Sequence, residues 1–436
     1  MLSPLRRFRG DRNLLVFPTP MRILQVFNRY LERGGEEESV ERISNVLAKR
    51  HEVFHCYFDS RMWTHESTGF DNLRHIVWMF YNPGAVERFR RQVQACRPDL
   101  ILVHNVFPVG SIGVLREATR LGIPVFHVVH NFRPFSVNGY LWADGRLIPQ
   151  GLKRNFIPEI LAGAWQNSRP KTAVLAGVLW MMHLMGIYNR IDCWLAISRF
   201  MRDAFVGAGI PAEKVFVLRH SWNSRCTSSA PVSRDQPTGV PSLLFLGRLT
   251  ESKGIEVLLK AWELAAEKVP HAKLYIGGSG PMEKVVSAAA ARLPRCEYVG
   301  QVGGARKEEL LTNCAAMVVP SVWWEPLGLV TYEAYDYGKP VLAAAAGGLS
   351  ETILPGETGW VHTPGDAAQL ADQIVEALNH PEECQRRGTN GRNWLQQHTR
   401  TEDWLDEFEL IANEILSKPK FQSPLKPVTL GKGPRG

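Results

Sequence analysis

Short apolar runs alternate with amphipathic segments along most of the chain. In the first half, RILQVF (22–27), DLILVHN (99–105) and PVFHVVHN (124–131) have the length and composition of buried strands. Between them, EEESVERISNVLAKR (36–50) and SIGVLREATRLG (111–122) repeat apolar residues at helical spacing. Strict alternation of strand and helix predicts a parallel sheet with helices on both faces, because each parallel connection must cross the sheet.

The second half of the chain repeats this scheme. SLLFLGRL (242–249), AKLYIGG (272–278), AMVVPS (316–321) and PVLAAA (340–345) resemble strands, and GIEVLLKAWELAAEKV (254–269) resembles a connecting helix. We therefore expect an α/β protein built from two Rossmann-like, doubly wound domains. Ligands bind such sheets at the carboxyl ends of the strands, so we expect the two domains to face each other across a ligand-binding cleft.

Changes in composition mark the expected domain boundaries. The stretch SSAPVSRDQPTGVPS is rich in Pro and Ser and lacks apolar periodicity, as is typical of a linker. The expected segments are a disordered or non-native extension (1–20), an N-terminal domain (21–227), the linker (228–242), a C-terminal domain (243–395), a helix that packs back toward the N-terminal domain (396–417) and a disordered tail (418–436).

Bulk composition narrows the class of protein. Of 436 residues, 45% are hydrophobic and 22% are charged, the profile of a folded soluble protein. The seven cysteines are scattered without a CxxC pair, which favours a reducing compartment, the cytoplasm, over a disulfide framework or a zinc site. A net charge of +8 suits nucleic acid, an anionic membrane or an acidic substrate. The absence of an RRM, zinc-finger or basic-zipper pattern argues against nucleic acid.

The longest apolar run, AVLAGVLWMMHLMGIY (173–188), bears on membrane contact. It has sixteen residues with a histidine inside, which is short for a bilayer span of about 20 residues. We expect a buried or surface-docked helix here. Together with the basic and aromatic residues of 151–188, it suggests peripheral contact with an anionic membrane, at its inner face.

Polar residues follow two of the strands expected in the N-terminal domain. The runs ILVHN and FHVVHN end in the pairs His104–Asn105 and His130–Asn131, and Arg133 follows closely. These side chains should gather at the carboxyl edge of the sheet, where they are candidates for the acceptor side of a binding site. The loop SVNGYLWADG (136–145), with two turn signals, is expected to be mobile.

Two loops between strands and helices carry residues suited to phosphate. Gly34 and Gly35 would let the backbone approach a ligand at the start of a helix, although turns also use paired glycines. In FLGRLTESKG, Gly247 and Arg248 end a strand and Lys253 precedes a helix. A guanidinium and an ammonium at one loop can clamp a diphosphate.

Two glutamates stand out in the mostly apolar stretch VWWEPLGLVTYEAYDYGKPVL. Glu325 precedes a helix expected over about 327–337, and Glu333 lies inside it, with seven residues between them. Free N–H groups at the helix start would hold phosphate, and each carboxylate could accept protons from a vicinal diol. These N–H groups belong to Gly328, Leu329 and Val330. The alternative is that Glu333 pairs with a nearby lysine and Glu325 caps the helix.

The segment EPLGLVTYE resembles the E-x7-E motif of retaining GT-B glycosyltransferases, in particular glycosyltransferase family 4. The resemblance covers nearly all of residues 21–417 and includes GRLTESKGIEVLLKAW, YIGGSGPMEKV, YDYGKPVLAAAAGGLSETI and PGETGWVHTPGD. In the N-terminal half, LVHN, VVHNFRP and NGYLWADG resemble members that build bacterial polysaccharides. Several motifs in the same order indicate this family far more specifically than any single motif does.

The resemblance implies a role for each candidate residue. Glu333 would hold the ribose hydroxyls of a nucleotide sugar such as a UDP- or GDP-sugar, and Glu325 and His130 would lie beside the transferred sugar. The diphosphate would be neutralised by Arg248 and Lys253. The amides of Leu329 and Val330 would assist, and the Gly34–Gly35 loop would lie close to the phosphates and the acceptor.

The implied reaction is transfer with retention to a saccharide or lipid-linked saccharide. It needs no metal, and the Asp-x-Asp element of metal-dependent transferases is not evident. Three alternatives are a glycoside hydrolase, a sugar-nucleotide epimerase of the same fold, and a nucleotide-sugar binding protein without catalysis. A hydrolase would have no use for a diphosphate clamp.

Overall fold

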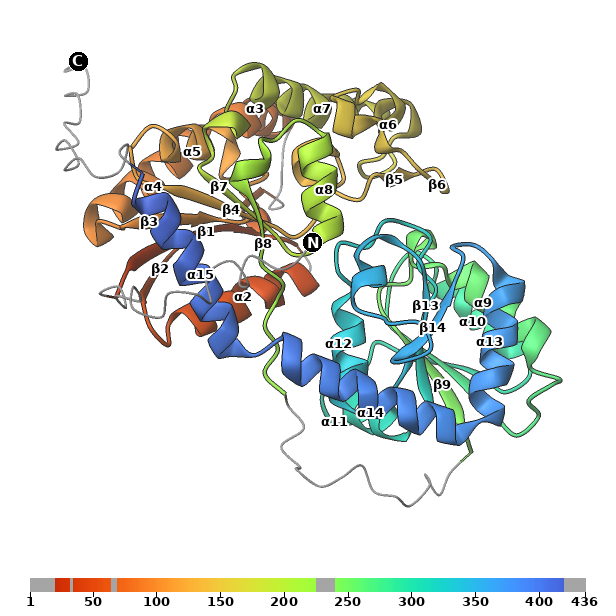
Figure 1. The fold of residues 1–436 in the computed structure, drawn as a ribbon. Coiled ribbons are helices and arrows are strands. Elements are labelled where there is room, and N and C mark those ends of the chain that lie inside the picture. The colour runs from red at the N-terminus through yellow and green to blue at the C-terminus, as the bar shows by residue number, and fades with distance from the viewer. Residues whose placement is uncertain (1–19, 32–33, 64–68, 225–239, 419–436) are drawn as a thin grey trace, which may run out of the picture.

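The computed structural model describes residues 20–31, 34–63, 69–224 and 240–418. Two six-stranded, wholly parallel sheets form the centres of two domains (Figure 1), which confirms the predicted α/β class. The predicted linker lies largely outside the described residues, as do nearly all of the N-terminal extension and of the C-terminal tail.

The N-terminal sheet has the strand order β2-β1-β3-β4-β7-β8. Its strands are β1 (Arg22–Arg29), β2 (Glu52–Asp59), β3 (Leu100–Val103), β4 (Val125–Val129), β7 (Cys193–Ala196) and β8 (Val215–Val217). The helices of this domain are α2 (Gly35–Leu47), α3 (Gly69–Phe80), α4 (Pro83–Cys96), α5 (Ser111–Ala118), α6 (Ile157–Ala162), α7 (Arg169–Leu184) and α8 (Arg199–Gly207). Strands β3 and β4 are buried along their length because helices cover both faces, and His127 is the one polar side chain in them.

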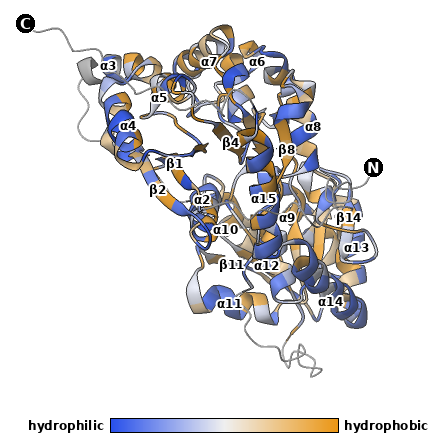
Figure 2. Cartoon of the chain, turned by 60° about the vertical axis from the view of Figure 1, so that its left-hand side comes forward, coloured by the Kyte–Doolittle hydropathy of each residue, from blue (hydrophilic) through white to orange (hydrophobic). Residues whose placement is uncertain are grey.

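The C-terminal sheet has the order β11-β10-β9-β12-β13-β14. Its strands are β9 (Ser242–Leu246), β10 (Lys273–Gly277), β11 (Cys296–Gly300), β12 (Ala316–Val319), β13 (Val341–Ala344) and β14 (Gly359–His362). The helices that follow in the chain are α9 (Ile255–Ala265), α10 (Glu283–Arg292), α11 (Gly304–Asn313), α12 (Leu329–Asp336), α13 (Ala367–Asn379), α14 (Pro381–His398) and α15 (Thr401–Leu416). Figure 2 shows hydrophobic residues along the strands and hydrophilic residues on the outer helices.

Three predicted boundaries differ from the structure. The linker was expected to reach residue 242, but Ser242 already pairs with Lys273 as the first residue of β9. Helix α14 runs through the boundary expected between residues 395 and 396, since no proline or glycine interrupts it there. Helix α12 begins at Leu329 rather than near 327, because Gly328 has φ +82 and so cannot continue a right-handed helix backward.

Residues 136–145 were expected to form a mobile loop, and the structure instead packs their first half against the domain. The buried carboxylate of Glu159 accepts hydrogen bonds from Ser136 Oγ at 2.6 Å and from the backbone N–H of Val137 at 3.0 Å. The second half contains β5 (Trp142–Ala143), which forms a short hairpin with β6 (Arg146–Leu147) just beyond the segment. Both expected turns occur, and they position Tyr140 between the two domains.

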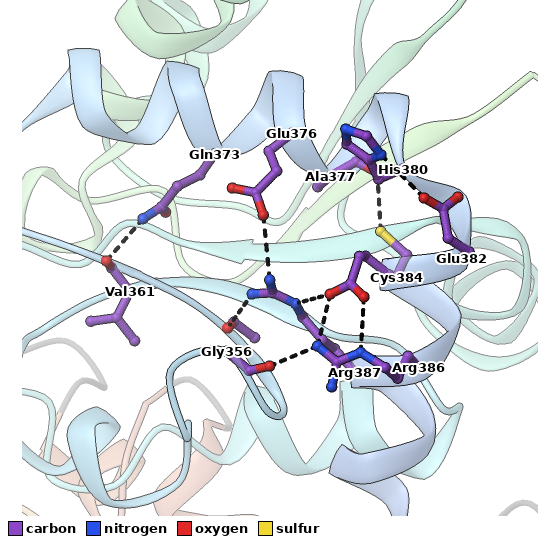
Figure 3. Close-up of polar contacts among 12 residues, drawn as sticks. Gly356, Val361, Gln373, Glu376, Ala377, His380, Glu382, Cys384, Arg386 and Arg387 are labelled. Atoms are coloured by element: carbon purple, nitrogen blue, oxygen red, sulfur yellow. Dashed lines mark hydrogen bonds and ion pairs between the residues drawn. The ribbon is translucent and has the colours of Figure 1, made fainter.

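Helix α14 is fixed to the C-terminal domain by buried charge. Arg387 lies 3.9 Å from the ring centre of Trp360 and donates to the carbonyl oxygen of Gly359 at 3.0 Å. The same guanidinium binds Glu383, and Figure 3 shows its contact with Glu376. A guanidinium satisfied on several sides holds the long helix in one orientation.

Helix α15 then leaves the C-terminal domain and packs on the N-terminal one (Figure 1). Arg50 Nη1 lies 2.7 Å from a carboxylate oxygen of Asp406, and the ring of Phe408 lies 6.1 Å from that of Phe126. A second link between the domains is Glu351, whose carboxylate accepts hydrogen bonds from the first two N–H groups of α8 and from Arg219 at 2.7 Å. The domains are therefore joined by buried and charged contacts as well as by the chain.

None of the described helices combines the length and apolar character needed to cross a membrane. Helix α7, which contains most of the longest apolar run, buries one side and exposes Met181 and Leu184 on another.

Candidate active site

Glu325 lies at the centre of a buried polar cluster in the loop between β12 and α12. Its Oε1 atom accepts hydrogen bonds from Lys253 Nζ at 2.6 Å, Ser321 Oγ at 2.7 Å and Trp323 Nε1 at 2.9 Å. Burial disfavours the charged carboxylate, but the ammonium group and these hydrogen bonds outweigh burial and hold the pKa of Glu325 below its ordinary value. Since all three donors bind Oε1, Oε2 can accept hydroxyl protons from a ligand.

Arg248 contacts the N-terminal domain through Tyr140. Arg248 Nη2 donates to Tyr140 Oη at 2.6 Å, and the guanidinium carbon lies 5.1 Å from the centre of the Tyr140 ring. Tyr140 also meets Trp323 edge to face, with ring centroids 5.0 Å apart, and Lys253 Nζ lies 5.2 Å from the Trp323 ring centre. The two cations predicted to bind phosphate therefore belong to one contact cluster between the domains.

The start of α12 leaves backbone donors beside this cluster. Gly328 is its N-cap in a left-handed conformation and no side chain caps the helix, so Glu325 does not act as the cap. The amides of Leu329 and Val330 lie in the first turn, whose N–H groups have no partner within the helix. The φ of +82 at Gly328 favours glycine there, and a Cβ atom at residue 328 would also lie 2.3 Å from the Leu349 side chain.

Glu333, one turn further along α12, pairs with a lysine. Its Oε1 accepts from Lys307 Nζ at 2.8 Å, and about a quarter of each side chain is exposed. This contact is the lysine pairing that the sequence left open. Both glutamates of the E-x7-E segment thus hold an ammonium group, and each lysine can follow its carboxylate or move to a phosphate.

The predicted glycines occupy different environments. A Cβ atom added at Gly34 or Gly35 would meet no protein atom within 4 Å, so packing inside the protein does not require glycine at these two positions. Gly247 is exposed at the end of β9, and its carbonyl oxygen would lie 1.8 Å from a Cβ added at Gly278. The loops after β9 and β10 therefore touch through their backbones.

A chain of hydrogen bonds fixes the tautomer of His130. Gln25 Nε2 donates to the carbonyl oxygen of Val40, which identifies it as the amide nitrogen, and it also contacts His104 Nε2 at 2.9 Å. His104 Nε2 must then accept, so Nδ1 carries the proton and donates to His130 Nε2 at 2.8 Å. Neutral His130 consequently carries its own proton on Nδ1, which is buried without a hydrogen-bond partner among the described residues.

Burial keeps these histidines neutral. It lowers the pKa of His130 to about 3 and that of His104 well below its ordinary value. His220 stacks on the other face of the network, 5.4 Å from His130 with nearly parallel rings, and burial lowers its pKa as well. The imidazole of His130 can therefore donate a hydrogen bond through Nδ1, but it does not supply a positive charge near neutral pH.

The remaining predicted residues of the N-terminal domain lie beside this network. Asn131 Nδ2 donates to Glu36 at 2.8 Å, and Asn105 Nδ2 donates to Tyr30 Oη at 3.0 Å. Arg133 donates to the carbonyl oxygen of Val137 at 2.8 Å. Together with His104 and His130 they line one pocket at the carboxyl ends of β3 and β4.

Several residues of the site were not predicted from the sequence. Glu36 lies in the acidic run directly after the paired glycines, which gave a signal of position but none of role. Lys307 is one of many charged residues on α11, and Tyr140 lies in the loop expected to be mobile. Among the described residues, no group of three or more His, Cys, Asp or Glu side chains is arranged to hold a metal ion.

Each half of the chain matches the model of a known protein family. Residues 34–220 match the model of the glycosyl transferase 4-like domain, and residues 230–394 match the model of the glycosyl transferases group 1. The chain belongs to the group 1 glycosyltransferases. The second match contains Arg248, Lys253 and both glutamates of the E-x7-E segment.

Two curated proteins are similar to about half of the chain. The glycogen synthase of Mycobacterium tuberculosis is 33% identical over 241 residues, which cover 54% of this chain and 56% of that protein. The phosphatidyl-myo-inositol mannosyltransferase of Mycobacterium leprae is 30% identical over 190 residues, covering 43% and 49% of the two chains. The matched regions thus span about half the length of these curated relatives.

A solved structure supports the GT-B fold of this group 1 glycosyltransferase. Anabaena HepE, crystallised in complex with UDP and glucose, superimposes with a TM-score of 0.62 at 18% identity. The superposition covers 90% of this chain and 100% of HepE. At this identity the likeness establishes the arrangement of two Rossmann-like domains and nothing finer.

Proposed function

We propose that the protein is a retaining, metal-independent transferase that moves a sugar from a nucleoside-diphosphate sugar to a saccharide or lipid-linked saccharide in bacterial glycan synthesis. The observation that carries the proposal is the Lys253–Glu325 cluster at the start of α12. It combines a carboxylate with a free oxygen for sugar hydroxyls, cations for a diphosphate and unpaired helix N–H groups. UDP and glucose bound to HepE are consistent with a donor of this kind.

Charge development determines what each residue does in the proposed reaction. Breaking the bond between the anomeric carbon and the diphosphate oxygen leaves negative charge on the leaving group. Arg248, Lys253 and the amides of Leu329 and Val330 stabilise that charge. Attack occurs on the face that the diphosphate leaves, so a phosphate oxygen can take the acceptor proton and the configuration is retained.

The carboxylates and His130 position the donor. Glu325 accepts hydroxyl protons of the transferred sugar through Oε2, and Glu333 accepts those of the ribose once Lys307 yields to it. His130 donates from Nδ1 to a sugar oxygen, which would satisfy an otherwise unpartnered buried N–H group. Glu325 is ionised, which argues against a hydrolase in which it would act as the general acid, since that role requires a raised pKa.

The lipid-linked acceptor implies contact with a membrane. Ile157, Leu161, Met181 and Leu184 on α6 and α7 expose 54%, 61%, 42% and 84% of their surface, at the top of the N-terminal domain in Figure 1. Lysines and arginines on the same segments are exposed as well, namely Lys153, Arg154, Arg169 and Lys171. Apolar side chains surrounded by cations suit the inner, anionic face of a cytoplasmic membrane.

The deciding experiment measures release of nucleoside diphosphate from UDP-, GDP- and ADP-sugars by wild type, Glu333→Ala and Lys253→Ala. We expect turnover of one donor, and a loss of about tenfold or more in both variants because each removes a hydrogen bond to a charged group. Lys260→Ala, an exposed lysine on α9 paired with Glu263, is the matched control and should behave as wild type.

Other outcomes identify the alternatives. An epimerase would return a different nucleotide sugar without accumulating free sugar or glycoside. Tight binding of a donor with no turnover would indicate a binding protein. A folded protein that neither binds nor turns over any donor would overturn the proposal.

A further inference from the structure

Tyr140 belongs to the N-terminal domain and touches the proposed donor site of the other domain. Its Oη atom accepts a hydrogen bond from Arg248 Nη2 at 2.6 Å, and its ring centre lies 5.1 Å from the guanidinium carbon. Arg248 itself is exposed in the loop after β9. An exposed arginine side chain loses conformational entropy when a ligand fixes it, so a partner that fixes the side chain beforehand favours binding.

The partner of Arg248 leaves its charge available to a ligand. A phenol holds a guanidinium without cancelling the positive charge, whereas a carboxylate would cancel it. Lys253 and Lys307 are each paired with a glutamate, but within the described ranges no acidic side chain forms an ion pair with Arg248. The contact with Tyr140 uses one of the guanidinium N–H groups and leaves the others for phosphate oxygens.

The ring of Tyr140 also contacts the support of the second cation. It meets Trp323 edge to face with ring centroids 5.0 Å apart, and Lys253 Nζ lies 5.2 Å from the centre of the Trp323 ring. Trp323 is buried and donates from Nε1 to Glu325 at 2.9 Å, which fixes the indole in one orientation. One side chain of the N-terminal domain is therefore in contact with Arg248 directly and with Lys253 through a single ring.

Buried polar groups hold the loop that carries Tyr140. The backbone N–H of Tyr140 donates to Asn138 Oδ1 at 2.9 Å, and that of Leu141 donates to Ser136 Oγ at 3.1 Å. Ser136 Oγ in turn donates at 2.6 Å to Glu159, a buried carboxylate that no step of the proposed reaction uses. Burying a carboxylate costs stability, and here its hydrogen bonds fix the loop as a preorganised site requires.

We propose that Tyr140 is a positioning residue of the donor site: it holds Arg248 and, through Trp323, Lys253 where the diphosphate of the donor binds. The inference rests on the proposed transferase function. It assigns the alignment of a donor-binding cation to a residue of the opposite domain, so the cations are aligned only while the two domains are in contact.

The test measures kcat and KM for the donor by release of nucleoside diphosphate, with the full chain and the donor that wild type turns over. Tyr140→Phe keeps the ring contacts and removes the hydroxyl that accepts from Arg248. We expect kcat/KM for the donor to fall about three- to tenfold, which corresponds to one hydrogen bond of ordinary strength. Tyr140→Ala also removes the ring contacts and should lower kcat/KM by a further factor of about three to ten.

A double-mutant cycle separates positioning from a structural role. Because Tyr140 acts through Arg248, Tyr140→Phe should have almost no effect in an Arg248→Ala background. A residue needed only for the fold would lower kcat/KM by the same factor in both backgrounds. Calorimetric Kd values for the nucleoside diphosphate should follow the same cycle, which serves where Arg248→Ala turns over slowly. Tyr81→Phe removes the hydroxyl of a tyrosine that is 47% exposed in the same domain, and this matched control should keep the wild-type kcat/KM.

The inference is overturned if Tyr140→Phe keeps the wild-type kcat/KM and Kd, or if its loss is as large without Arg248 as with it. A lower KM in Tyr140→Phe would also overturn it, because Tyr140 would then compete with the donor for Arg248. In each of these outcomes wild type still turns over its donor. Failure of the proposed function is different, since wild type then turns over no donor and binds no nucleoside diphosphate, and the inference fails with it.

Discussion

Replacing Lys253 with methionine should destabilise the C-terminal domain in a way that depends on pH. The substitution removes the counter-ion of Glu325, whose side chain is only 6% exposed, and leaves Ser321 and Trp323 as neutral donors. Breaking a buried ion pair on one side costs about 3–5 kcal/mol. Because Lys253 is 23% exposed and two donors remain, we expect the lower end, about 3 kcal/mol at pH 8.

The sign of the pH dependence follows from the two pKa values of Glu325. In wild type the folded-state pKa is lowered, so the pair stabilises the fold above the ordinary glutamate pKa, and this contribution is lost as pH falls below it. In Lys253→Met burial dominates and the pKa rises, so the carboxylate becomes protonated and less costly near pH 5. The difference in stability between variant and wild type should therefore be larger at pH 8 than at pH 5.

Differential scanning calorimetry at both pH values measures the effect. At about 2–4 °C per kcal/mol for a domain of this size, the transition of the C-terminal domain should fall by roughly 6–12 °C at pH 8. The double variant Lys253→Met/Glu325→Gln removes the buried charge and should recover most of the loss. Lys260→Met, which breaks an exposed pair with Glu263, is the control and should change little. The reasoning fails if the loss is equal at both pH values, or if the double variant is no more stable than the single one.

Two further predictions concern acid stability and membrane contact. Burial lowers the pKa of His127 to about 3, well below the ordinary histidine value of about 6.5. The fold therefore has its full stability from neutral His127 above pH 6.5 and loses it as pH falls from about 6.5 toward 3, because the unfolded chain binds the proton first. At pH 5 the loss in free energy of unfolding is about 2 kcal/mol. The variant His127→Phe keeps a ring against Trp194 and should reduce the fall in melting temperature between pH 7 and pH 5. An unchanged dependence of melting temperature on pH would contradict this prediction. Wild type should co-sediment with vesicles that contain anionic lipid at low salt, whereas the double variant Leu161→Glu/Leu184→Glu should stay in solution. If wild type does not bind such vesicles, the proposed membrane contact is wrong.

The fold was predictable because its signal is local and repeated. Apolar runs of four to eight residues between amphipathic segments suffice to predict parallel sheets, and both sheets contain the predicted strands. Strands β7, β8 and β14 were not predicted. What local pattern could not give was the end of each element. Helix α12 starts late because Gly328 has φ +82, a conformation that ends the helix and that the apolar pattern does not encode. Residues 136–145 pack closely because Glu159 binds the backbone of Val137.

In the candidate site, too, local motifs were predictable from the sequence and contacts between distant residues were not. The E-x7-E spacing and the Arg248–Lys253 loop are local, and the structure brings Lys253 and Glu325 into direct contact. The contact between Tyr140 and Arg248 joins residues 108 apart, and that between Glu36 and Asn131 joins residues 95 apart. No periodicity in one sequence encodes such pairs, so Tyr140 and Glu36 could be found only once the strands were in register.

The position of α15 sets an order of events during synthesis. The site on the N-terminal sheet that receives Phe408, next to Phe126, is filled by residues that the ribosome makes only after the entire C-terminal domain. At about 5–20 residues per second, the roughly 200 residues between β8 and the end of α15 take about 10–40 s to emerge. During that interval the nascent first domain presents an uncovered apolar surface to chaperones, and it reaches its final packing only when translation has passed the second domain.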